Sequence, residues 1–185
     1  MPRSDLLRRY GRIIEDHKQY DVVEISATSL AESAGEVTGL SSKDIEERIK
    51  LADSLDMWED GFDIMRDNDN PTLLECLDVL TADKATFDGM RGLRNAIESG
   101  PKPAAAQTLR NCLMKRRRDY PTTIAQDVQK LREHLPRRLH MAVEIRMGEM
   151  QILAETIQYL GRFSFEKENT PRSRGPAAKR QKARS

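Results

Sequence analysis

The chain of 185 residues, 38% hydrophobic and 33% charged, can bury one core of moderate size and carries more charge than the roughly 25% of an average soluble domain. No apolar run approaches the roughly 20 residues of a membrane-spanning helix, and charges occupy the N-terminus where a signal peptide needs an apolar segment, so we expect an intracellular protein. The net charge of +1 hides an asymmetry, because eight basic and two acidic residues give the segment 162–185 a charge of +6 and leave −5 for residues 1–161.

The first 40 residues predict little regular structure. Ser4 and Asp5 are typical of a helix start and Gly11 of a helix end, while the β-branched run 22–25 predicts a strand. A lone strand cannot satisfy its hydrogen bonds, and a partner is available only around residues 62–65. Residues 26–40, rich in Ser, Ala, Gly and Thr, are expected to form a weakly ordered connection with one short helix.

Helices are predicted throughout the segment 41–161. Their start signals are the capping residues Ser41 and Asp44, Pro71 after an Asn-Asp-Asn turn, and the capping box of Thr123 with Gln126. Further helices are expected at about 83–99, at 103–119 and from Pro136 onward.

The last two helices have informative apolar patterns. The spacing of Ile124, Val128, Leu131 and Leu135 predicts one buried stripe. The final helix is apolar on two sides, which predicts the central helix of a bundle. Its first face comprises Leu139, Val143, Met150, Leu153, Ile157 and Leu160, and its second Met141, Ile145, Ile152 and Tyr159.

The cysteines and histidines form no recognisable site. Cys76 and Cys112 sit among apolar neighbours without the paired spacing of a zinc site, so we interpret them as core residues. His17, His134 and His140 show no metal-ligand spacing and are interpreted as structural or surface residues.

Two other side chains have alternative interpretations. Arg146 lies within an apolar face, where it is expected to extend toward water or to pair with Glu149 or Glu75. Trp58 either packs in the core or anchors a peptide, and core packing is favoured.

The segment from Tyr120 to Leu160 resembles the substrate-binding domain of SET proteins of the Rubisco large-subunit methyltransferase type. The match is long and ordered. It is carried by Tyr120, Pro121, Thr122, Thr123, Ile124 and Asp127, followed by Arg137, Arg138, Arg146, Met147, Gly148 and Glu149. The subgroup that methylates ribosomal proteins is the most similar.

The N-terminus resembles the end of the catalytic SET domain in the same family. The run Ser-Asp-Leu-Leu before Tyr10 and Gly11, followed by the strand at 22–25, matches that segment. The resemblance implies that Tyr10 lines the channel for the target lysine, where an aromatic hydroxyl can orient an amine. The alternative is a tyrosine that packs a helix end.

The resemblance implies S-adenosylmethionine as the cofactor of the full-length family, yet the chain has no Gly-x-Gly segment and no Asn-His pair. We therefore expect no cofactor binding by this chain alone. The implied organisation is a SET remnant at 1–27, a linker at 28–40, a helical substrate-binding domain at 41–161 and a disordered basic tail at 162–185. The expected fold is mainly α, a multi-helix bundle after a short helix and strand.

Charge suggests the partner. The segment 41–90 has five basic and fourteen acidic residues, and 110–146 has ten basic and four acidic. The acidic part is expected to attract a basic protein substrate through Asp60, Asp63 and Asp67, and the resemblance implies a ribosomal protein as one such substrate.

Two alternatives remain from other classes of protein. One is a non-catalytic interaction protein, and the other is an RNA-associated adaptor that uses the basic run 115–118 and the tail. The segment 179–184 is similar to a nuclear-import signal, so the nucleus, the cytoplasm or both are expected. No membrane or metal is expected.

Overall fold

The computed structural model describes residues 22–66, 70–90 and 102–164. These residues form seven helices and a two-stranded sheet, which confirms the predicted mainly helical fold. The elements in chain order are β1 (Val22–Ser26), α2 (Ala27–Thr38), α3 (Ser42–Ser54), β2 (Gly61–Met65), α4 (Pro71–Thr81), α5 (Lys84–Met90), α6 (Pro103–Arg118), α7 (Ile124–Leu131) and α8 (Arg137–Ser164).

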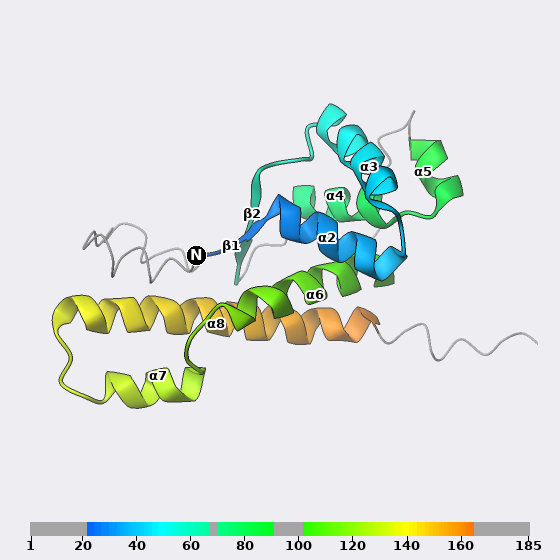
Figure 1. Cartoon of the computed structure of the whole chain (residues 1–185). Coiled ribbons are helices and arrows are strands. Elements are labelled where there is room, and N and C mark those ends of the chain that lie inside the picture. Colours follow the sequence, from blue (N-terminus) through cyan, green and yellow to red (C-terminus); the bar gives the residue numbers. More distant parts are fainter. Residues whose placement is uncertain (1–21, 67–69, 91–101, 165–185) are drawn as a thin grey trace, which may run out of the picture.

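The described residues divide into two regions (Figure 1). The arm, residues 121–147, consists of α7 packed along the N-terminal part of α8. The body contains the other described residues, with α6 packed between α2 and α4 on one side and the C-terminal part of α8 on the other. Helix α8 therefore belongs to both regions and connects them.

The strand at the N-terminus of the described chain pairs with the segment that the sequence predicted as its partner. β1 and β2 are antiparallel, with Val23 opposite Ile64 and Ile25 opposite Phe62. These four side chains are buried and form the inner face of the sheet, which lies against α6 and α8. The alternation of buried and exposed residues along both strands is that of a sheet with one covered face.

The segment 26–40, predicted as a weakly ordered connection with one short helix, is more regular than predicted, because Ala27–Thr38 forms the three-turn helix α2. The Ser26 hydroxyl caps it by accepting from the Ser29 amide at 3.2 Å, and Gly39 ends it with a positive φ of 71°. Leu30 and Ala34 are fully buried in the core. The small residues that suggested weak order instead let α2 and α6 approach closely.

The predicted helix starts in the body are confirmed. Ser41 and Asp44 form a capping box, with the Asp44 amide donating to the Ser41 hydroxyl at 3.3 Å. Asn70 caps α4 ahead of Pro71. Of the helix expected at about 83–99, the structure describes Lys84–Met90, and the remainder lies outside the described residues.

A buried arginine connects three helices of the body through its side-chain contacts. Arg48 of α3 donates to the carbonyl oxygen of Val79 in α4 at 2.9 Å, and its guanidinium lies 4.5 Å from the ring centroid of Phe87 in α5. Burial lowers the pKa of Arg48, while the nearby carboxylates of Asp44 and Asp83 oppose that shift. The helical pattern of α3 did not predict this contact.

The central position of α8 is confirmed in the body. Leu153 of its first predicted face and Ile152 of its second are both fully buried. Helix α8 is buried on two adjacent sides because it packs against α6 and against the sheet.

In the arm, the predicted buried stripe is only partly covered, with Ile124, Leu131 and Leu135 half-buried. Val128 is 38% exposed, whereas Asp127 is completely buried. The inward side of α7 is thus centred on a carboxylate, and a pattern of apolar spacing cannot show that.

Candidate functional site

The two described candidate aspartates lie at the outer strand of the sheet. Asp63 is in β2 and exposed, and Asp60 immediately precedes β2 and is also exposed. The candidates Asp67 and Tyr10 lie outside the described residues. The two exposed aspartates therefore lie three residues apart at the start of β2.

The hydrogen-bond register determines which backbone groups of β2 face outward. The Ala27 amide donates to the Asp60 carbonyl at 3.1 Å, continuing the register in which Ser26 faces Gly61. Antiparallel strands alternate hydrogen-bonded and non-hydrogen-bonded pairs. Asp63 and Glu24 consequently form a non-hydrogen-bonded pair, the kind whose Cα atoms are only about 4.5 Å apart.

Glu24 and Asp63 place two carboxylates side by side on the outer face of the sheet. Both are exposed, and like charges directly opposite each other destabilise a strand pair by roughly 0.2–1 kcal/mol. Gly61 makes room for this arrangement, because a Cβ added there would lie 2.9 Å from Oε1 of Glu24. We call Glu24 and Asp63 the acidic face, and the exposed Asp60 precedes β2 at one end of the sheet.

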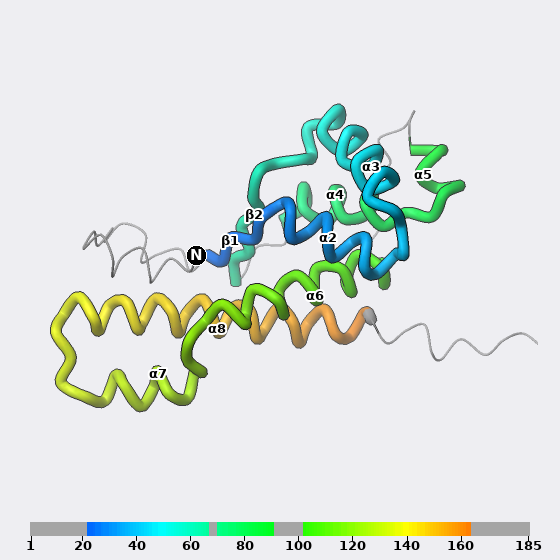
Figure 2. The backbone as a smooth tube through the Cα atoms, viewed as in Figure 1, coloured from blue at the N-terminus to red at the C-terminus, as the bar shows by residue number. Residues whose placement is uncertain are grey.

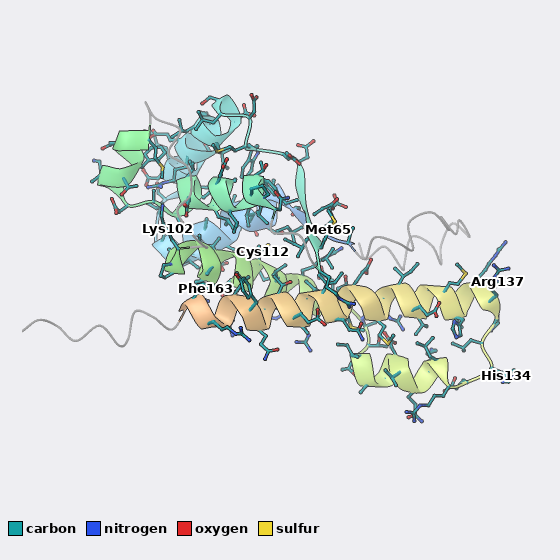
Figure 3. The ribbon with its side chains drawn as sticks, turned by 180° about the vertical axis from the view of Figure 1, so that it is seen from behind. Met65, Lys102, Cys112, His134, Arg137 and Phe163 are labelled. Atoms are coloured by element: carbon teal, nitrogen blue, oxygen red, sulfur yellow. The ribbon has the colours of Figure 1, made fainter. Side chains whose placement is uncertain are left out.

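Side-chain contacts flank the strand that carries Asp63. Beneath it, the Trp58 ring meets the ring of Phe62 edge-on at 6.2 Å, which confirms the packing interpretation of Trp58. Beyond β2, Arg66 donates to Gln151 at 3.2 Å and pairs with Glu155 at 3.4 Å, both on α8. Figure 3 shows Met65, the last residue of β2, beside α8.

Five residues of the family motif pair with one another where the arm meets the body, a place that we call the joint: Tyr120, Thr122, Asp127, Arg146 and Glu149. The Tyr120 hydroxyl donates to Oε2 of Glu149 at 3.0 Å, and both side chains are buried. Burial and the neighbouring Glu149 carboxylate raise the pKa of Tyr120, so the phenol stays protonated.

A second pair in the joint connects α7 to α8. Nε of Arg146 donates to Oδ2 of Asp127 at 2.8 Å, and Nη2 of the same guanidinium donates to Oδ1. The Thr122 hydroxyl donates to Oδ1 at 2.9 Å. The predicted partners of Arg146 were wrong, because the arginine reaches across to α7 rather than along its own helix.

The joint is structural, since its polar groups point at one another rather than at an accessible surface. Sequence reasoning missed the role of Asp127. The available signal was a pair of opposite charges, Asp127 and Arg146, each on the apolar side of consecutive helices. Buried opposite charges in neighbouring helices are expected to pair.

The basic run at the end of α6 is partly engaged in ion pairs. Lys115 lies 2.7 Å from Glu36, and Arg116 lies 3.3 Å from Asp119. Arg117 and Arg118 are exposed. The run therefore offers a smaller positive surface than its sequence suggests.

The cysteines are buried, as predicted. Burial raises the pKa of Cys76 to about 12 and that of Cys112 to about 11, which makes both thiols unreactive at neutral pH. His134 is exposed and His140 lies 3.5 Å from Glu144. Among the described residues there is no metal-ligand cluster and no helix able to cross a membrane.

The family comparison identifies the helical segment. Residues 40–153 match the family model described as Rubisco LSMT substrate-binding. The match spans β2, α3 to α7 and most of α8, and it includes the whole joint. No curated protein matches the chain.

The fold is similar to part of a solved structure, a crystal structure of the SET domain of LSMT bound to lysine and AdoHcy. The TM-score is 0.51 at 20% identity, and the similarity covers 85% of this chain. It covers 37% of that structure. At this identity the likeness establishes the fold alone.

Proposed function

The chain belongs to the Rubisco LSMT substrate-binding family, and we propose that it docks a basic protein for lysine methylation by a SET active site. The acidic face is the observation that carries the proposal. Two carboxylates are held side by side at a cost in stability, on a sheet whose other face is fixed in the core. A basic protein that binds there relieves the repulsion.

The chemistry is assigned to a separate region. Methyl transfer needs the sulfonium of S-adenosylmethionine in line with the lysine amine, and this positioning supplies most of the rate. The chain has neither of the family's usual cofactor segments, and Tyr10 alone cannot provide that alignment. We therefore expect calorimetric titration of this chain with S-adenosylmethionine to show no binding heat, and saturable binding would contradict this assignment.

The docking surface is tested by reversing its charge. The variant Asp60→Lys, Asp63→Lys, Asp67→Lys should bind purified basic ribosomal proteins at least about tenfold more weakly at about 20 mM salt, with the difference shrinking at about 300 mM. The matched control reverses three exposed acids of α3, namely Glu46, Glu47 and Asp53, and changes the net charge equally.

Only the location of the charge distinguishes these two variants. If both weaken binding equally, the effect comes from net charge and the acidic face is not the docking surface. If neither weakens it, the proposed substrate class is wrong.

RNA binding is a second candidate, favoured by exposed basic residues at the end of α6 and on the arm. These residues are Arg117, Arg118, Lys130, Arg132, Arg137 and Arg138. Figure 3 shows Arg137 and His134 at the far end of the arm. A salt series of RNA binding by the full chain and by residues 1–161 tests the candidate, since the slope reports how many phosphate contacts are lost with the tail.

The proposed cellular location is the nucleus or cytoplasm, where ribosomal proteins are found. It rests on the basic segment 179–184. Replacing Lys179, Arg180 and Lys182 with alanine should shift a fluorescent fusion from the nucleus to the cytoplasm. An unchanged distribution would remove the import role.

A further inference from the structure

The outer edge of β2 presents unpaired backbone groups in register with the acidic face. Because Asp60 lies opposite Ala27 in a hydrogen-bonded pair, the strand alternation directs the N–H and C=O groups of Gly61, Asp63 and Met65 away from β1. Among the described residues, β2 pairs with β1 alone. Figure 2 shows β2 running from the α3 side of the body toward α8.

The residues whose N–H and C=O groups point away from β1 are also those whose side chains lie on the outer face of the sheet. Gly61, Asp63 and Met65 alternate with the buried Phe62 and Ile64. An exposed strand edge is a template for another strand, and main-chain hydrogen bonds to such an edge are a common mode of peptide recognition.

The negative charges of Asp63 and Glu24 determine which kind of strand can pair with the edge of β2. A second copy of the chain would bring another Asp63 beside the first, and the two acidic faces would repel each other. A strand with lysine or arginine at alternate positions would place each cation over Asp63 or near Glu24. The edge therefore selects against self-association and in favour of a basic partner.

We propose that a basic extended segment of the substrate protein adds to β2 as an antiparallel third strand. This inference rests on the proposed docking function and specifies its mode. Residues directly opposite each other in antiparallel strands share a face. The residue facing Asp63 thus directs its side chain to the acidic face and its own N–H and C=O toward β2.

The register makes a prediction that simple electrostatic attraction does not. In the peptide Lys-Thr-Lys-Val-Lys-Thr-Lys, the lysine amides should donate to β2, whereas the threonine and valine amides should face solvent. N-methylation removes a donor without changing the charge. Methylating the third and fifth residues should weaken binding to the full chain by at least about tenfold, from two lost hydrogen bonds.

The matched control methylates the fourth and sixth residues of the same peptide, which should leave the affinity within about threefold. A second measurement follows amide exchange in the full chain. Saturation with the unmodified peptide should slow exchange at Gly61, Asp63 and Met65 and leave Phe62 and Ile64 unchanged, since their amides already face β1.

The outcomes separate this inference from the docking function. Equal affinity of all three peptides, with binding still lost in the charge-reversed variant, would overturn strand addition and leave the docking function standing. If methylation of the fourth and sixth residues weakens binding more than methylation of the third and fifth, the proposed register is overturned. Failure of the peptide to bind at all would overturn strand addition, while the ribosomal-protein experiment would still test docking by itself.

Discussion

The body and the region where the arm meets it are stabilised by different kinds of interaction. The body has a continuous apolar core drawn from both strands and from α2 to α6 and α8. Where the arm meets the body, two buried polar pairs hold neighbouring segments against α8, Tyr120 with Glu149 on the body side and Asp127 with Arg146 on the arm side. Apolar packing accepts many residue combinations of similar volume, whereas a bidentate pair requires specific residue types.

This difference explains what the family motif encodes. Its residues specify the geometry of the joint, and the substrate contacts that we propose lie elsewhere, on the sheet. The two places are connected, because Arg66 beyond β2 contacts Gln151 and Glu155, which follow Glu149 on α8 by two and six residues. Helix α8 therefore carries contacts both to the joint and to the residue that follows β2.

The largest effect is expected from breaking the buried pair of the joint. Asp127→Ala leaves the guanidinium of Arg146 without its carboxylate and removes the acceptor of Thr122. Loss of one partner from a buried pair costs about 3–5 kcal/mol, which urea denaturation will measure. Glu155→Gln removes an exposed pair with Arg66, whose side chains are 42% and 59% exposed, and should cost less than about 1 kcal/mol.

The same variant tests whether arm and body unfold separately. Cys76 and Cys112 are buried in the body, so thiol labelling at pH 8 reports opening of the body. If the arm opens alone, Asp127→Ala will speed amide exchange in α7 and leave labelling unchanged. Parallel acceleration of both would show that the two regions unfold as one unit.

A cavity in the body should cost nearly as much as breaking the joint. Leu77→Ala removes a fully buried side chain of α4 and is expected to destabilise by about 2–5 kcal/mol. Val128→Ala, on the exposed side of α7, should change stability by less than about 0.5 kcal/mol. A large loss from Val128→Ala would mean that the apolar stripe of α7 is covered after all.

Removing the Tyr120 hydroxyl should have an intermediate effect. Tyr120→Phe deprives the buried Glu149 carboxylate of this donor, at a cost of about 1–3 kcal/mol at pH 7. The raised pKa of Tyr120 adds stability that is fully present below pH 10, its ordinary value, and is lost as pH rises toward the raised value.

The pH dependence distinguishes this hydrogen bond from general packing. Wild-type stability should fall above pH 10 more steeply than that of Tyr120→Phe, measured by urea denaturation from pH 8 to 11. Identical slopes for the two proteins would show that the phenol does not titrate differently in the folded state.

The sequence predicted the elements of this fold well where local chemistry defines them. The caps at Ser41 and Thr123, the prolines at helix starts and the β-branched run of β1 all act within a few residues. The length of α2 was underestimated because small residues give a weak periodic signal. The partner of Arg146 was missed because an ion pair between helices depends on how α7 folds back on α8, which no local pattern contains.

The candidate site was only partly predictable for the same reason. Charge pointed to Asp60 and Asp63, but the place of Glu24 beside Asp63 emerged only from the register of the two strands. Cross-strand pairs connect residues far apart in the chain, so no local spacing shows them.

The smallest expected effects come from two matched caps, one in each region. Ser41→Ala and Thr123→Ala each remove a capping box, from α3 in the body and from α7 in the arm, at about 1 kcal/mol. If the arm opens independently, Thr123→Ala should speed exchange in α7 alone, while Ser41→Ala should lower the urea midpoint of the whole protein. Equal shifts of the midpoint would contradict a separately opening arm, because a cap can lower global stability only where its helix unfolds together with the core.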